Sequence, residues 1–178
     1  MPKINGHISL IMLAILLFPS VSWAEKIKTR YAIFFFQNHD QLEEFNDNLR
    51  VGKQLYYLVK KRKARTVADE VKNKIDVIVE KVQTILEFYP DELKFRIHLY
   101  EKVKDVKKSY QKIYGRKGPY VAFYSPRNNS VYISVEDAGL KVFAHELAHV
   151  VIENYYTVPT PPKIHEFLAR MATSQIVR

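Results

Sequence analysis

The chain of 178 residues has no cysteine and only five glycines. The lack of cysteine excludes a disulfide framework, an iron–sulfur cluster held by thiolates and a cysteine nucleophile. Few glycines, 47% hydrophobic residues and 13% aromatic residues exclude collagen-like, low-complexity and disordered architectures. The chain can therefore bury an ordinary core, and it carries a formal net charge of +9.

The first 24 residues differ in composition from the rest of the chain. They contain one charged residue, Lys3, followed by an apolar run at 8–18, Pro19, and the small residues Ser22 and Ala24. This pattern is typical of a signal peptide that is cleaved after Ala24. The apolar run is shorter than the about 20 residues of a membrane-spanning helix, which disfavours a permanent anchor. We expect an exported, periplasmic or extracellular protein with no membrane span in its mature chain.

Hydrophobic periodicity predicts a single α+β domain over 25–178, with a small mixed sheet and an edge hairpin packed on helices. The expected order is a strand at 27–35, a short helix from Asp40, a long helix from Thr66 to Pro90, a strand at 95–100, a helix ending at Gly115, and a hairpin of 120–124 and 131–135. An N-terminal strand and helix part at 25–115 therefore precedes a part at 119–178 that carries the chemistry.

Two of these elements allow finer predictions. Alternation in the first strand predicts that its odd-numbered residues, from Ile27 to Phe35, face the core. In the long helix, apolar residues recur at steps of three and four from Val71 to Tyr89. That stripe predicts the inner face of a helix backing the sheet, with a coiled-coil seam as the alternative.

The clearest chemical pattern is an HExxH motif formed by His145, Glu146 and His149 within the apolar stretch 140–153. A stretch of this length and composition predicts a helix. Because residues four apart share a helix face, both imidazoles can reach one metal ion. Glu146 points to the side of the pair, where it can accept a proton from water. The motif predicts one Zn²⁺ per chain.

Two other interpretations of the motif stay open. The motif can arise by chance, in which case its histidines are hydrogen-bonded core residues, or it can be a relic site that has lost its metal. Burial of two histidines and a glutamate on one apolar helix is costly unless they share a partner, which favours a metal site.

A catalytic zinc needs a third protein ligand and one open position. Ile152 and Tyr155 stand where metzincins have glycine and histidine, which excludes that class. After a proline-rich turn, an expected last helix from Lys163 carries two candidates, His165 and Glu166. Only one of them can face the ion, because neighbouring helical positions point about 100° apart.

The last two expected helices resemble those of gluzincin metallopeptidases, in which a glutamate on the second helix completes the HExxH site. The family pattern of a proline, an aliphatic residue, the glutamate and Leu-Ala matches Pro162, Ile164, Glu166, Leu168 and Ala169. The resemblance covers about residues 119–175. It implies a zincin-like domain in which Glu166 is the third zinc ligand, with His165 as the runner-up.

The activity that the resemblance implies is hydrolysis of peptide or protein substrates by zinc-bound water, with Glu146 as the catalytic base. Such sites commonly include a tyrosine or histidine that stabilises the oxyanion. The candidates for this role are Tyr155, Tyr156, Tyr132 and His165.

The family layout also implies that the strand just before the metal helix is the edge of the sheet and pairs with an extended substrate. The residues of this strand are Val131, Tyr132, Ile133 and Ser134. An ordinary half-buried strand is the alternative.

The sequence departs from the family at two positions. Thermolysin-like enzymes have an aspartate four residues after the ligand glutamate, which orients a zinc-binding histidine, whereas this chain has Arg170. The orienting groups must therefore come from elsewhere. Phe167 stands where related families commonly have glycine, which implies narrower access to the metal.

The densest charge run extends from Lys60 to Arg65. One interpretation of this run is a solvated loop or helix end. A second is a binding surface for an anionic envelope polymer or nucleic acid, and a third is a basic cleavage site. Two functions stay open on this basis. The first is an exported, monomeric zinc metalloendopeptidase, and the alternative is a non-catalytic, basic, envelope-binding domain on a degenerate zincin scaffold.

Overall fold

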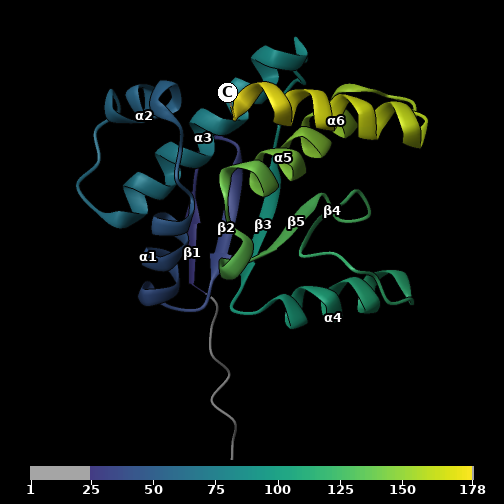
Figure 1. Ribbon diagram of the computed structural model, residues 1–178, viewed down its shortest axis with the longest axis horizontal. Coiled ribbons are helices and arrows are strands. Elements are labelled where there is room, and N and C mark those ends of the chain that lie inside the picture. The colour runs from purple at the N-terminus through teal and green to yellow at the C-terminus, as the bar shows by residue number, and fades with distance from the viewer. Residues whose placement is uncertain (1–24, 178) are drawn as a thin grey trace, which may run out of the picture.

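The computed structural model describes residues 25–177 (Figure 1). The predicted signal peptide at 1–24 lies outside the described residues. Within them, a five-stranded mixed sheet and six α-helices confirm the α+β class. No helix of this part of the chain is long and apolar enough to cross a membrane.

The sheet has the strand order β1-β2-β3-β5-β4. Its strands are β1 (Glu25–Lys28), β2 (Ala32–Phe36), β3 (Phe95–Tyr100), β4 (Ala122–Ser125) and β5 (Ser130–Ser134). The inner strands β2, β3 and β5 are parallel to one another, and β1 and β4 pair antiparallel to their neighbours. The two hairpin strands β1 and β4 therefore form the edges.

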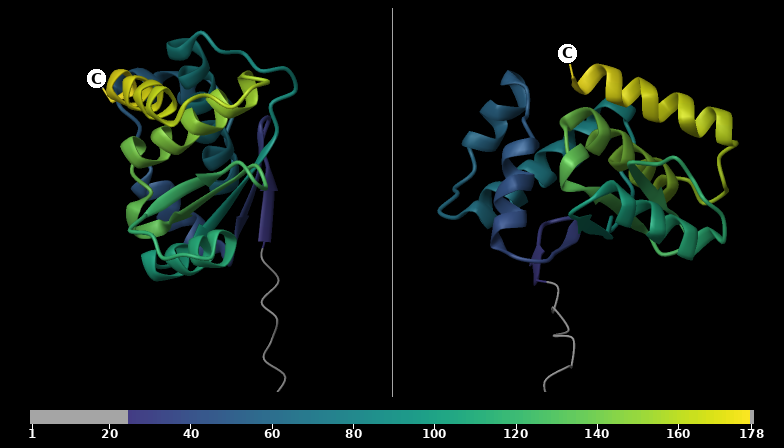
Figure 2. Two further views of the ribbon diagram at one scale, coloured as in Figure 1. Left: turned by 90° about the vertical axis from the view of Figure 1, so that its right-hand side faces the viewer. Right: turned by 60° about the horizontal axis from the view of Figure 1, so that its bottom comes forward.

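Helices cover the two faces of the sheet unequally, as Figures 1 and 2 show. The helices are α1 (His39–Asn48), α2 (Lys53–Lys60), α3 (Val67–Leu86), α4 (Val103–Tyr114), α5 (Leu140–Tyr155) and α6 (Pro162–Ile176), with a 3-10 turn at Val135–Asp137. The main core lies between the sheet and the layer that contains α1, α3, α5 and α6. On the opposite face, α4 packs on a smaller aromatic cluster that includes Tyr110, Phe123 and Tyr132.

Two of the predicted helix boundaries, at Thr66 and Gly115, are confirmed. Thr66 caps α3 by accepting a hydrogen bond from the Asp69 backbone N–H, and Gly115 ends α4 in the left-handed region at φ 71°. The long helix ends at Leu86, before Pro90, with Glu87 in the left-handed region. Its apolar stripe packs in the main core from Val71 to Ile85, as the backing-helix interpretation predicts, whereas Tyr89 lies beyond the helix and is 59% exposed.

The first predicted strand is wrong in extent and in face. The chain turns at Thr29, whose Oγ1 accepts hydrogen bonds from the backbone N–H groups of Tyr31 and Ala32, so that β1 and β2 form a hairpin. The even-numbered residues of β2 are buried, whereas Ile33 is 36% exposed. Apolar residues on both faces of this segment made the alternation ambiguous.

Two helical features were not predicted from the sequence. Helix α1 is capped by Asn38, whose side chain accepts a hydrogen bond from Gln41 N–H, and begins before Asp40. Helix α2 lies just ahead of the basic run and buries only Leu55 and Val59. An element with so few core positions gives a weak periodic signal.

The prediction that Val131–Ser134 forms the edge of the sheet is wrong. This segment belongs to β5, which lies between β3 and β4, and all five of its residues are buried. The physical reason is that β5 pairs in parallel with β3 on one side while the hairpin brings β4 to its other side. The edge strand beside the HExxH helix is β4.

Candidate metal centre

The HExxH residues lie on α5, which follows β5 through the short turn at Val135–Asp137. Core residues such as Phe143, Leu147 and Ile152 are fully buried and hold this helix in place. Helix α6 begins at Pro162, which fits the first helical turn because no N–H is needed there. The packing of α6 along α5 brings Glu166 to the two histidines (Figure 1).

Three potential metal ligands converge between α5 and α6. His145, His149 and Glu166 each offer one donor atom, and these atoms lie within 4.8 Å of one another. His149 Nε2 is 3.1 Å from His145 Nε2, and Glu166 Oε2 is 3.7 Å from His145 Nε2 and 3.6 Å from His149 Nε2. The fold therefore brings the three predicted ligands together between α5 and α6.

The separations between these donor atoms match the geometry of a zinc site. A tetrahedral zinc ion with ligands at about 2.0–2.1 Å places its donor atoms about 3.3 Å apart. The observed separations of 3.1, 3.7 and 3.6 Å lie close to this value. Two imidazole nitrogens and one carboxylate oxygen are also the donor set of known catalytic zinc sites.

Burial keeps both histidines in the form that binds metal. Burial lowers the pKa of His145, and it lowers the pKa of His149 to about 3, with the neighbouring histidines adding to the effect. Both imidazoles are therefore neutral at pH 7. Since a metal ion binds only the unprotonated nitrogen, no proton has to be displaced from a charged ring.

Glu146 lies beside this ligand set and is itself buried. Burial raises the pKa of its carboxyl group to about 7, which a backbone hydrogen bond from Tyr124 of β4 partly opposes. A carboxylate with this pKa can both accept and return a proton near neutral pH. The Glu146 carboxyl group thus interacts with the edge strand β4 and adjoins the two histidines on α5.

Each of the three ligand side chains also contacts a residue of α6. Thr173 Oγ1 is 3.4 Å from His145 Nδ1, His165 Nδ1 is 2.8 Å from His149 Nδ1, and the Arg170 guanidinium donates a 2.6 Å hydrogen bond to Glu166 Oε1. His165 thus lies behind His149, not in the ligand set. Its role as a third ligand is not supported by this geometry.

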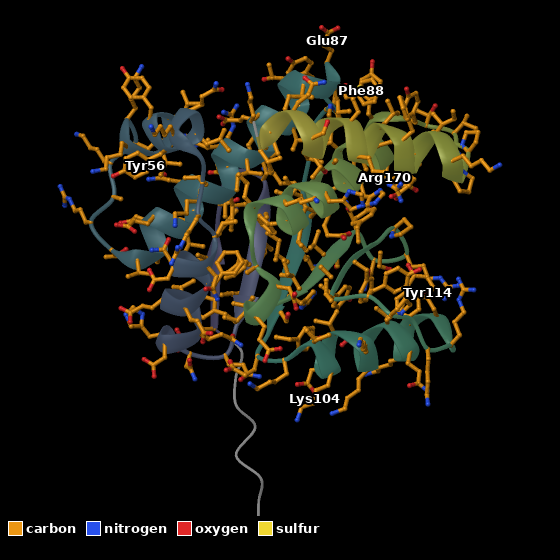
Figure 3. The ribbon with its side chains drawn as sticks, viewed as in Figure 1. Tyr56, Glu87, Phe88, Lys104, Tyr114 and Arg170 are labelled. Carbon is orange, nitrogen blue, oxygen red and sulfur yellow. The ribbon has the colours of Figure 1, made fainter. Side chains whose placement is uncertain are left out.

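Two hollows meet at the ligand set. One, of about 770 Å³, is lined by Val121, Lys141, Val142 and Arg170 in addition to His145, Glu146 and Glu166. The other, of about 460 Å³, contains the same three residues and is lined by β4 and by Tyr110, Tyr114 and Tyr120. In Figure 3, Arg170 lies below α6, on the side of that helix toward α4 and Tyr114. Together the hollows leave room for a ligand on both sides of Glu146.

The structure does not bring the predicted tyrosines to the ligand set. Tyr155 and Tyr156 pack on Phe88, and Tyr132 lies on the α4 side of the sheet, stacked between His98 and Phe123. Neither hollow at the ligand set is lined by these three tyrosines. The tyrosines that do line one are Tyr110, Tyr114, Tyr120 and Tyr124.

Thr173, which contacts His145, and Glu153, whose Oε2 lies 3.5 Å from His165 Nε2, were not predicted from the sequence, although helical spacing indicated both. Glu153 follows His149 by four residues on α5, and Thr173 follows Glu166 by seven on α6, so each shares a helix face with a ligand. The tyrosines of α4 gave no such signal, because they reach the site through the packing of α4 beside β4.

Comparison with known proteins does not place the chain in a family. No known family, curated protein or solved structure matches it.

Proposed function

We propose that this protein is an exported zinc metallopeptidase of the gluzincin type, with a zincin-like arrangement of α5 and α6. The observation that carries the proposal is the convergence of two neutral imidazoles and one carboxylate, with donor atoms within 4.8 Å of one another. The HExxH motif and the downstream glutamate supply the resemblance, and the adjoining buried Glu146 supplies a base.

The residues divide the chemistry between them. His145, His149 and Glu166 would hold Zn²⁺, which when bound supplies Lewis acidity that polarises the scissile carbonyl and acidifies water. Glu146 accepts a proton from the attacking water and returns it to the leaving amine. Tyrosines on the α4 side of the site, with Tyr120 42% exposed, are the groups available to stabilise an oxyanion.

We propose β4 as the strand that pairs with an extended peptide substrate. β4 ends the sheet next to α5, and the Tyr124 backbone of this strand lies close enough to Glu146 to lower the pKa of its carboxyl group, which supports this proposal. The two hollows open beside β4 and its flanking residues. A peptide paired there would pass Glu146 and place side chains in both hollows.

Zinc content and hydrolysis test the proposal together. Elemental analysis of the purified protein should give one zinc per chain, and Glu166→Ala should lose it. Glu146→Gln should keep the zinc and lose hydrolysis of a peptide library, while Glu44→Gln, at an exposed position on α1, should change neither. A wild-type protein that takes up no zinc after reconstitution would exclude this function.

The alternative is a non-catalytic, envelope-binding domain that uses the basic run 60–65. In the structure, this run lies at the end of α2 and in the following loop. Three of its cations contact residues of the chain itself: Lys60 lies over the Tyr56 ring, Lys61 over the Tyr57 ring, and Arg62 pairs with Glu80. These contacts favour the solvated helix end over a dedicated polymer site.

A further inference from the structure

We infer that His165 and Thr173 are positioning residues that fix the tautomers of His149 and His145, so that both rings present an unprotonated Nε2 to one metal ion. The inference rests on the proposed function and extends it. In thermolysin-like enzymes an aspartate four residues after the ligand glutamate orients a zinc-binding histidine, but this chain has Arg170 at that position. We assign the orienting role to other residues of α6.

The hydroxyl proton of Thr173 is already engaged in a hydrogen bond within α6. Thr173 Oγ1 donates a 2.7 Å hydrogen bond to the backbone carbonyl of Ala169, one turn earlier on α6. Toward His145 Nδ1, at 3.4 Å, the same oxygen can therefore only accept. The proton of neutral His145 is accordingly favoured on Nδ1, which leaves the lone pair on Nε2.

His149 Nδ1 lies 2.8 Å from His165 Nδ1. One of these nitrogens donates and the other accepts, so the contact alone allows two arrangements. Glu153 selects between them through its charge, because its Oε2 lies 3.5 Å from His165 Nε2, which is buried and has no hydrogen-bond partner, and a nearby carboxylate favours the proton on that nitrogen. His165 Nδ1 then accepts from His149 Nδ1, and the lone pair of His149 also points from Nε2.

In these tautomers, the acceptor atoms of the ligand set face one another. His145 Nε2 and His149 Nε2 lie 3.1 Å apart, and both face Glu166 Oε2. Arg170 occupies the other carboxylate oxygen of Glu166 through its 2.6 Å hydrogen bond. Three lone pairs that converge without a donor form a site that a cation stabilises.

The supporting groups share one element. His165, Arg170 and Thr173, together with the ligand Glu166, all lie on α6, whereas the two ligand histidines lie on α5. Glu153 is the exception, since it reaches His165 from α5. Docking of α6 on α5 therefore supplies the third ligand and orients all three ligands at the same time.

The test is zinc affinity by chelator competition, with the cobalt-substituted protein giving a spectroscopic measure of ligand geometry. His165→Phe keeps a ring but removes the acceptor, and His165→Asn restores an acceptor oxygen near the Nδ1 position. Thr173→Val removes the acceptor at nearly constant shape, and Thr173→Ser restores it. Ser174→Ala, at an exposed neighbouring position of α6, is the control.

We expect zinc affinity to fall about 10- to 100-fold in His165→Phe and in Thr173→Val, as for other residues that orient metal ligands. His165→Asn, Thr173→Ser and Ser174→Ala should stay within about threefold of the wild type, and the Co²⁺ absorption bands should change only in the two weakened variants. If His165→Phe does not fold, the Thr173 pair decides the question.

The outcomes separate this inference from the proposed function. Wild-type affinity and unchanged Co²⁺ spectra in both weakened variants would overturn the positioning role while leaving the metal site intact. A wild-type protein that binds neither Zn²⁺ nor Co²⁺ would overturn the proposed function itself.

Discussion

Two groups of polar side chains contain partly or fully buried acceptors, and they differ in whether a donor of the chain faces each acceptor. The first, here called the α3 charge cluster, consists of Asp76 and Glu80 of α3 with Arg30 and Arg62. Both Asp76 oxygens accept from the Arg30 backbone N–H at 3.2 Å, and Glu80 Oε2 accepts from the Arg62 guanidinium at 2.5 Å. Every carboxylate of this cluster faces a donor.

The second group is the ligand set of His145, His149 and Glu166, whose metal-facing atoms face one another. Its donor groups lie behind the ligands, at Thr173, His165 and Arg170. The α3 charge cluster is complete within the chain, whereas in the tautomers inferred above the ligand set faces no donor and would be completed by a cation. This difference separates a structural role from a binding role, because buried acceptors without donors are costly.

The largest expected effect is on catalysis, in the variant Glu146→Gln. Loss of the base should lower kcat/KM for peptide hydrolysis by about 10²- to 10⁴-fold. The thermal stability of the metal-free protein should not fall, because burial already disfavours the ionised carboxylate, as its raised pKa of about 7 indicates. Steady-state kinetics measures the loss of activity, and thermal unfolding measures the stability. If Glu146→Gln keeps full activity, Glu146 is not the catalytic base.

Metal removal should have the next largest effect. With free zinc at about a thousand times its Kd, binding should stabilise the folded state by about 4 kcal/mol, and a chelator should abolish this gain. Thermal unfolding with and without chelator measures the difference. In Glu166→Ala the unfolding curves with and without chelator should coincide. If the chelator destabilises this variant as much as it destabilises the wild type, zinc binds elsewhere.

The candidate metal centre shows which contacts a sequence can predict. His145, Glu146 and His149 could be predicted because they lie within one helical turn, where spacing alone fixes geometry. Glu166 required a resemblance to known peptidases, since 16 residues separate it from His149. The contact between His165 and His149 could not be derived, because it depends on how two helices pack.

The sheet shows the same limit at longer range. The hairpin of β4 and β5 was predicted correctly, because its turn is local. The edge was assigned to the wrong strand, since the parallel pairing of β5 with β3 joins residues more than 30 positions apart. Alternation also failed at Phe34, where apolar neighbours on both sides concealed which face is buried.

A substitution in the α3 charge cluster should affect stability and leave metal binding unchanged. Asp76→Ala removes the acceptor for the Arg30 backbone N–H and should cost about 1–3 kcal/mol of unfolding free energy. Urea unfolding measures this cost, and chelator competition should give wild-type zinc affinity. A weaker zinc site in this variant would mean that the two clusters are coupled through α3 and α5.

The smallest expected effect comes from the cap of α3, in the variant Thr66→Ala. Loss of the hydrogen bond from the Asp69 backbone N–H to Thr66 Oγ1 should cost about 1 kcal/mol of unfolding free energy. Thr66→Ser should restore most of it, because the shorter side chain keeps the oxygen. Helix α3 packs against both α5 and α6, so this pair of variants tests whether a modest loss of stability by itself weakens zinc binding. Equal zinc affinity in both variants would show that the ligand set depends on its own orienting contacts, whereas a parallel loss would tie metal affinity to the global stability of the fold.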